Sequence, residues 1–343
     1  MKKHSILFGA VGIGIVLFAV IMSFLNDTSR VLEDDGSVRE YHWVLGCDSS
    51  DDTVTVLYGR KFAELVEEYS DGKMSIQVFS NATIGGDSDL LQYVKNQDGA
   101  NFLVQTTAPE VNYMPQLAVF DLPMAHQTID EVRAALDDET FLSMAEAIYT
   151  EAGYHLMGFS DQSFRVMSSN RSISSFDDFR GIKIRTMENA NHMAFWKALG
   201  CGATPMSFSE VYTSLQNGTI DAQENPYETI VGNRLYEQQK YIVQTNHLPH
   251  ILALVTGDTL YQNLNPAERE IIDRAAEEAR QYSRQLADDR VQERLDIITE
   301  SGTEIVEIPD TLYRQMLEAS EPVYASIREQ VGDDLVNAYL GKK

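Results

Sequence analysis

The sequence is short of cysteine and of positive charge. Cys47 and Cys201 are its two cysteines among 343 residues, which excludes a framework of several disulfide bonds. Lone cysteines are usually small buried hydrophobes, and a single bridge between these two is the alternative. Lysine and arginine number 27 against 52 acidic residues, so the formal net charge is −25. Because this charge would repel a phosphate backbone, we expect no nucleic-acid partner.

Motifs of common catalytic and cofactor sites are also missing. The sequence contains no G-x-S-x-G, no H-E-x-x-H, no Walker loop, no G-x-G-x-x-G and no usefully spaced cysteine–histidine pair. His247 and His250 are near each other, but no third metal ligand lies close to them in the sequence. Acidic pairs such as Asp177-Asp178 are interpreted as solvated surface. We therefore predict neither an enzyme nor a metal site, and no cofactor.

The N-terminus has the pattern of an export signal. Lys2 and Lys3 precede an uncharged apolar run from residue 5 to residue 25. A run of about 20 residues can span a bilayer as a helix. Residues 1–25 are thus predicted to be a signal peptide or an uncleaved membrane anchor, followed by an acidic linker at 26–40. In either case we expect the folded part outside the cytoplasm, in the periplasm or on the outer face of the cytoplasmic membrane.

Strand and helix patterns alternate over the rest of the chain. We expect strands near 41–47, 74–78, 102–105, 154–159, 182–184, 219–223 and 303–308, and helices near 54–71, 87–95, 129–152, 189–199, 208–217 and from 309 onward. Ser207 and Glu210 have the S-x-x-E spacing of a capping box. Residues 266–301 contain no Gly or Pro after Pro266, which predicts a helix roughly 50 Å long. Regular alternation favours an α/β fold with largely parallel sheets.

Arg185 is the residue with the clearest chemical meaning in this pattern. It ends the predicted strand of Gly181-Ile182-Lys183-Ile184-Arg185, just before a helix that Asn189 is expected to cap. Open α/β sheets bind ligands at the carboxyl ends of their strands. A guanidinium there can hold a carboxylate with two hydrogen bonds. The alternative is an ordinary exposed arginine at a strand end.

Several segments, in the same order, resemble the TRAP-type (tripartite ATP-independent periplasmic) transporter solute-binding proteins, the DctP-type family. The resemblance is carried by 62–66 with Gly72-Lys73, by Ile84-Gly85-Gly86-Asp87, by Val119-Phe120-Asp121-Leu122-Pro123 and above all by 181–230. It extends over most of the chain after the linker. The sequence departs from the family pattern at Asn189-Ala190-Asn191, where many relatives have a proline after the asparagine.

The resemblance implies a two-lobe, periplasmic-binding-protein-like fold (type II-like) with a hinge and one long helix that spans both lobes. Lobe I would comprise residues 41–163, with part of 251–300 returning to it. Lobe II would comprise residues 164–250, with part of 300–343 packing on it. The spanning helix would be 266–301.

The resemblance also implies a function and a set of site residues. The protein would be the extracytoplasmic solute-binding subunit of a TRAP-type secondary transporter. It would capture a small organic acid by lobe closure and deliver this carboxylate to a small and a large integral-membrane subunit. Arg185 would form an ion pair with the ligand carboxylate, and Arg165 would be a second arginine of the cleft. The remaining expected ligand-binding residues are Asn225, Phe208, Glu188, Thr106, Thr107 and Cys47.

Three other functions remain as alternatives at this point. A ligand-sensing subunit would report occupancy to a signalling partner instead of feeding a transporter, and the sequence does not separate the two. An exported enzyme on the same fold would need the catalytic groups that are missing. A binder of sugars or metals would not account for the paired arginines Arg165 and Arg185.

Overall fold

The computed structural model describes residues 36–342, so the predicted signal or anchor and most of the linker lie outside this range. None of the helices found between residues 36 and 342 is long and apolar enough to cross a membrane. Residues 39–342 belong to one compact unit.

A single mixed sheet organises this unit. In the described part of the chain, eight strands follow the order β2-β1-β3-β8-β4-β7-β5-β6, and a ninth, β9, pairs with β8 outside this path. The strands are β1 (Tyr41–Gly46), β2 (Met74–Phe79), β3 (Phe102–Thr106), β4 (Tyr154–Ser169), β5 (Lys183–Thr186), β6 (Gly202–Pro205), β7 (Ala222–Asn225), β8 (Tyr241–Gly257) and β9 (Glu304–Val306).

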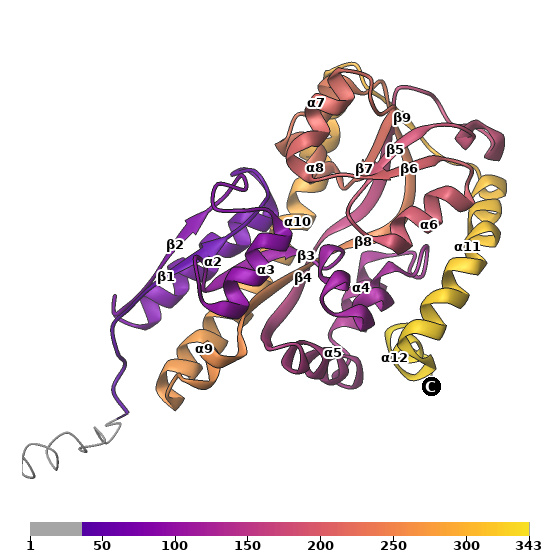
Figure 1. Cartoon of the computed structure of the whole chain (residues 1–343). Helices are drawn as coiled ribbons and strands as arrows, with labels where there is room; N and C mark the ends of the chain where they lie inside the picture. The colour runs from indigo at the N-terminus through magenta and orange to yellow at the C-terminus, as the bar shows by residue number, and fades with distance from the viewer. Residues whose placement is uncertain (1–35, 343) are drawn as a thin grey trace, which may run out of the picture. The chain divides into compact units, whose positions relative to one another are not determined.

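Two long antiparallel strands connect the two ends of the sheet. β4 and β8 pair with each other from Tyr154 and Gly257 to Ser169 and Tyr241. β8 also pairs antiparallel with β3, and β4 pairs antiparallel with β7. The strand pairs at both ends of the sheet are parallel. β1 pairs with β2 and β3 at one end, and β5 pairs with β6 and β7 at the other. Figure 1 shows β4 and β8 running from the group around β1 and β2 to the group around β5, β6 and β7.

Helices cover the sheet and follow the predicted order. They are α2 (Val54–Tyr69), α3 (Asp87–Asn96), α4 (Ile129–Leu136), α5 (Glu139–Glu151), α6 (Ala190–Ala198), α7 (Val211–Gln216), α8 (Tyr227–Gly232), α9 (Asp258–Gln262), α10 (Pro266–Glu300), α11 (Asp310–Val331) and α12 (Asp333–Tyr339). Short 3₁₀ helices lie at η1 (Pro109–Asn112), η2 (Pro115–Asp121), η3 (Phe176–Phe179), η4 (Phe208–Glu210) and η5 (Leu235–Gln238).

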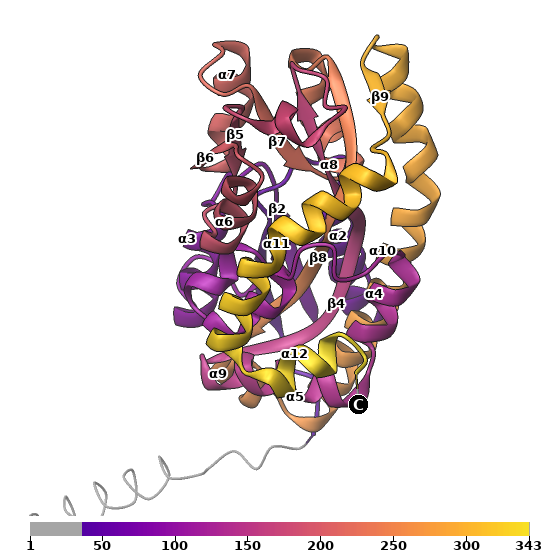
Figure 2. The ribbon, with the colours of Figure 1, turned by 90° about the vertical axis from the view of Figure 1, so that its right-hand side faces the viewer.

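The long helix expected at 266–301 is α10. Asn265 caps it by accepting a hydrogen bond from the Glu268 backbone N–H at 3.0 Å. α10 packs against α2 near one end of the sheet, against β4, and against α8 near the other end (Figure 2). One helix therefore contacts elements of both predicted lobes.

Three local expectations are wrong. The helix expected at 129–152 is two helices, because the Asp138 side chain accepts hydrogen bonds from the Thr140 and Phe141 backbone N–H groups and starts α5 anew. The predicted capping box does not form, because the first turn at Ser207 is η4 and its hydroxyl contacts Ser209 instead. The sheet is less parallel than predicted, because β4 and β8 pair antiparallel over their length. β4 extends well beyond the predicted strand end at Phe159, and β8 was not predicted.

Gly257 provides a test of the packing where β8 meets α3. An added Cβ would lie 2.6 Å from the Val94 carbonyl oxygen, which is backbone and cannot move aside. We expect Gly257→Ala to lower the free energy of unfolding by about 1–3 kcal/mol in denaturant titrations. Gly202→Ala is the control, because its nearest atom would be the Ile182 carbonyl oxygen at 3.7 Å. Equal effects of the two substitutions would contradict this packing.

Candidate functional site

A cavity lies at the carboxyl ends of four strands. Its volume is about 160 Å³, and its lining includes Asp48 after β1, Thr106 of β3, Arg185 of β5 and Asn225 of β7. The first turn of α3 closes one side. Strand ends of this kind are where α/β sheets bind ligands. The volume is below the range typical of drug-sized pockets and suits a small solute.

Arg185 is the buried cation of this cavity. The residue is 2% exposed, and its Nε and Nη2 donate to the Met206 carbonyl oxygen at 3.0 and 2.7 Å. Its Nη1 has no hydrogen-bond partner within residues 36–342. Burial lowers the pKa of the guanidinium to about 10, so it remains charged at neutral pH. A buried charged donor without a partner is costly, which makes this nitrogen a site for an anion.

The amide of Asn225 has a fixed orientation. Arg165 Nη2 donates to Asn225 Oδ1 at 3.0 Å, and Asn225 Nδ2 donates to Gln223 Oε1 at 2.6 Å. The amide nitrogen carries two hydrogens, so one remains for a ligand. Because Asn225 lines the cavity, it offers a second donor there besides Arg185.

Arg165 does not line the cavity, contrary to the expectation that it contacts the ligand directly. The residue is 1% exposed, and its Nε and Nη2 donate to the Glu224 carboxylate at 2.5 and 2.9 Å. Its Nη1 contacts His250 Nδ1. The guanidinium is therefore occupied by protein partners and holds Asn225 from behind the cavity.

Of the other expected site residues, three line the cavity and two do not. Phe208, Glu188 and Thr106 line the cavity. The Arg185 guanidinium lies over the Phe208 ring, 5.7 Å from its centroid, in a cation–π contact. Thr107 and Cys47 are buried behind the lining, with 4% and 1% of their surface exposed. Cys47 and Cys201 are both buried and unpaired.

The sequence and the structure can now be compared with known proteins. Residues 46–330 match the family model of the bacterial extracellular solute-binding proteins, family 7. A solute-binding protein from Verminephrobacter eiseniae is 29% identical over 273 residues, which are 79% of this chain and 80% of the relative.

Two solved structures share the fold over most of their length. The sugar acid binding protein DctPAm from Advenella mimigardefordensis, in complex with galactonate, has a TM-score of 0.85 and 27% identity and covers 89% of this chain and 98% of its own. A TRAP periplasmic solute-binding protein from Shewanella oneidensis with bound succinate has a TM-score of 0.84 and 25% identity, covering 88% and 99%.

The chain belongs to this family of TRAP-type solute-binding proteins. Its fold is that of the periplasmic binding proteins of TRAP transporters, and the relatives are solute-binding proteins, not enzymes. Sensing and catalysis, the two alternatives on the same fold, have no support from these matches.

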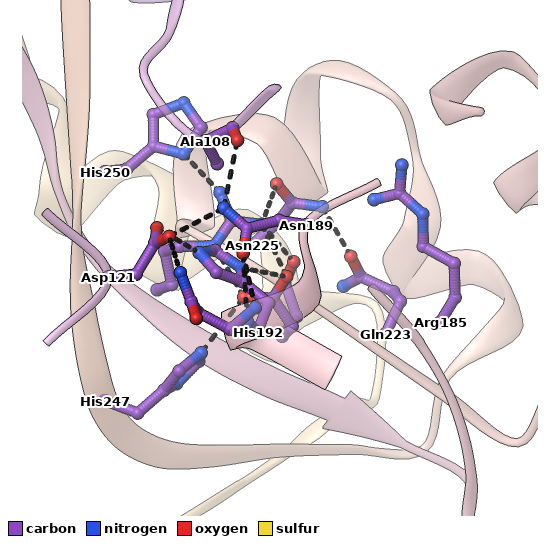
Figure 3. A network of polar contacts seen from close by, with 12 residues as sticks. Ala108, Asp121, Arg185, Asn189, His192, Gln223, Asn225, His247 and His250 are labelled. Carbon is purple, nitrogen blue, oxygen red and sulfur yellow. Dashed lines mark hydrogen bonds and ion pairs between the residues drawn. The ribbon is translucent and has the colours of Figure 1, made fainter. Parts of the chain in front are cut away.

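This solute-binding protein has a buried polar network around Glu224. Figure 3 shows its members Asp121, His192, Asn225 and His247. The Glu224 carboxylate accepts from Arg165 and lies 3.0 Å from His247 Nε2 and 3.9 Å from His192 Nδ1. Burial opposes ionisation, but Arg165 and the two histidines hold the pKa of Glu224 well below its ordinary value. Glu224 is therefore a carboxylate that compensates the buried charges beside it.

Asp121 joins this network to the 3₁₀ segment η2. Its Oδ2 accepts from Asn189 Nδ2 at 2.8 Å and from Asn191 Nδ2 at 2.9 Å, and its Oδ1 lies 3.1 Å from His192 Nε2. Asn189 also caps α6 by accepting from the backbone N–H groups of residues 191 and 192. Asn191 thus supplies Asp121 with a donor in addition to Asn189.

His250 completes the cavity lining from β8. Burial, followed by the charge of Arg165, lowers its pKa well below 6.5, so the ring is neutral. Because a guanidinium can only donate, Nδ1 accepts from Arg165 and the ring proton lies on Nε2. His247 and His250 therefore contact Glu224 and Arg165 of the network. Among residues 36–342, no three His, Cys, Asp or Glu side chains are placed to hold a metal ion.

Six residues that line the cavity or form the network were not predicted as parts of the site from the sequence. These are Asp48, Asp87, His250, Glu224, His192 and Asp121. Glu224 stands directly before Asn225, but a single acidic residue in a predicted strand has no distinguishing pattern. Its partners come from β4, α6 and β8, which only the folded chain brings together.

His192 makes the stability of the network depend on pH. Burial acts to lower its pKa, but Asp121 and Glu224 together raise it to about 9, above the ordinary 6.5. Its contribution is therefore complete below pH 6.5 and lost as pH rises through about 9. The difference corresponds to about 3 kcal/mol. We expect the wild-type free energy of unfolding, measured in denaturant between pH 6.5 and 9.5, to fall by an amount of this order.

His192→Gln should lose this pH dependence, whereas the exposed control His42→Gln should keep it. Identical pH profiles for wild type and His192→Gln would contradict a charged His192 in the folded protein.

Proposed function

We propose that this protein captures a small organic acid in the cavity, with Arg185 binding the ligand carboxylate. The observation that carries the proposal is the buried Arg185 Nη1, charged and without a partner in the described chain. A carboxylate oxygen supplies the missing acceptor and the missing negative charge together. The acids bound by the relatives from Advenella and Shewanella, galactonate and succinate, support this choice of ligand.

Two further donors would share the carboxylate. The free hydrogen of Asn225 Nδ2 and the Nε2–H of His250 belong to residues that line the same cavity as Arg185. Arg165 would act through Asn225, because it does not line the cavity and its Nη2 holds Asn225 Oδ1. We infer that the protein binds and releases its ligand without a chemical step.

Binding would proceed by closure of lobe I (41–163) onto lobe II (164–250). The proposed boundary falls where β4 is irregular: its register with β8 shifts between Asp161 and Phe164, and Ser163 has φ 67°. On β8, Asn246 has φ 42°. Asn246 lies in a second register shift, between the pairs Arg165–Leu248 and Met167–Val243. Two successive interruptions in the pairing of neighbouring strands are a suitable place for a hinge, because few ladder hydrogen bonds resist bending there.

Delivery of the ligand to membrane subunits is also part of this proposal. We infer that the closed protein delivers its ligand to a small and a large integral-membrane TRAP subunit outside the cytoplasm. The export pattern of residues 1–25, which lie outside the described residues, supports this location.

A thermal-shift screen of the full chain against organic acids tests the ligand and its anchor. An acid present at 100 times its Kd should stabilise the protein by about 2.7 kcal/mol. Arg185→Ala should weaken binding by at least about tenfold, since a charged hydrogen bond is lost.

Arg180→Ala is the matched control, because that arginine's side chain is 84% exposed. It should bind as wild type does. The proposal fails if no acid stabilises the wild type, or if Arg185→Ala binds as tightly as Arg180→Ala.

A further inference from the structure

Apart from Arg185, the charged residues of the cavity lining are acidic. Asp48, Asp87 and Glu188 line the cavity together with Arg185, and Asp89 lies beside them in the first turn of α3. Because His250 is neutral, Arg185 is the one positively charged side chain among the described residues of the lining. The lining thus combines one cation with several acidic side chains.

Two of these acidic residues stabilise the start of α3. Asp89 Oδ2 accepts from the Gly86 backbone N–H at 3.2 Å and so satisfies a donor at the start of α3. Asp48 faces the backbone amide of Asp87 at the same helix start. Negative groups at a helix N-terminus are favourable, so these two residues have a structural reason to be there.

Asp87 lies in the same first turn of α3, but neither its carboxylate nor that of Glu188 has a hydrogen-bond donor in the described chain. The Glu188 carbonyl oxygen accepts from Asn112 Nδ2 at 2.7 Å. Arg185, buried and with Nη1 unpartnered, lines the same cavity without an ion pair to either of them. The cavity therefore has an unused donor on Arg185 and unused acceptors on Asp87 and Glu188.

The charges disfavour a second negative group on the ligand. Burial, followed by the charge of Asp48, raises the pKa of Asp87 well above its ordinary value, and burial raises that of Asp48. The charge of Arg185 acts in the opposite direction on both groups, but burial prevails, so an added negative charge is unfavourable beside them. Once the first ligand carboxylate pairs with Arg185, the described lining has no further cation to compensate a second one. An N–H or O–H group of the ligand would instead use the free acceptors.

We propose that the ligand is a monocarboxylate whose far end donates hydrogen bonds through ammonium or hydroxyl groups, and that dicarboxylates are disfavoured. This inference rests on the proposed function, since it needs Arg185 as the carboxylate anchor. It adds that Asp87 and Glu188 receive the far end of the ligand.

Matched ligands test the inference on the full chain by isothermal titration calorimetry. Galactonate and galactarate differ in whether the far carbon is a hydroxymethyl or a carboxylate. Succinate, 4-hydroxybutyrate and 4-aminobutyrate share a four-carbon chain and differ in the same way, with an ammonium group added as a third case. In each set, we expect a monocarboxylate to bind at least about tenfold more tightly than the dicarboxylate. Comparing the affinities of 4-hydroxybutyrate and 4-aminobutyrate shows whether the site prefers a neutral or a charged donor.

Variants locate the selectivity. Asp87→Asn, which keeps the side-chain shape, should reduce the preference for the monocarboxylate by about tenfold, and Asp48→Asn should change it in the same direction. Asp98→Asn, at an exposed aspartate just after α3, should leave it unchanged.

The outcomes separate the two claims. A dicarboxylate that binds as tightly as its matched monocarboxylate overturns the inference and leaves the proposed function standing. So does a preference that Asp87→Asn and Asp48→Asn leave intact. Binding that persists undiminished in Arg185→Ala, or no binding by any of these acids, contradicts the proposed function and the inference with it.

Discussion

The ion pair between Arg165 and Glu224 determines what the rest of the site can do. Two arginines are buried within the same part of the sheet, and each must find negative charge or remain costly. Glu224 forms an ion pair with Arg165 through Nε and Nη2 of the guanidinium, whereas Arg185 has no ion pair within residues 36–342 and its Nη1 has no hydrogen-bond partner there. The positive charge that a ligand can satisfy is therefore at Arg185.

The same ion pair gives the site its geometry. Val166 of β4 is paired with Asn225 of β7, and Gln223 of β7 with Arg185 of β5, so the strand register places the two arginines on either side of β7. Because Arg165 fixes the oxygen of Asn225, the amide nitrogen is the atom left for the cavity. His192 and Asp121 extend the network to α6 and η2, so it also fastens segments that are distant in sequence.

The elements that the sequence predicted well depend on local signals. The absence of Gly and Pro after Pro266 identified α10, and Asn189 caps α6 as expected, because capping and periodicity act within a few residues. Arg185 was singled out by its place at a strand end and by the family resemblance, and the structure places it, buried, in the cavity lining. The direction of Arg165, by contrast, follows from Glu224 and His250, which lie on other strands. β8 and the break at Asp138 were missed because long-range pairing and a new helix cap overrode the apolar pattern.

A crystal structure of the protein with the acid that stabilises it most would test the central claim directly. The account predicts carboxylate oxygens within hydrogen-bonding distance of Arg185 Nη1 and Asn225 Nδ2, with Arg165 still paired to Glu224. A carboxylate bound to an Arg165 released from Glu224, or bound away from Arg185, would contradict it.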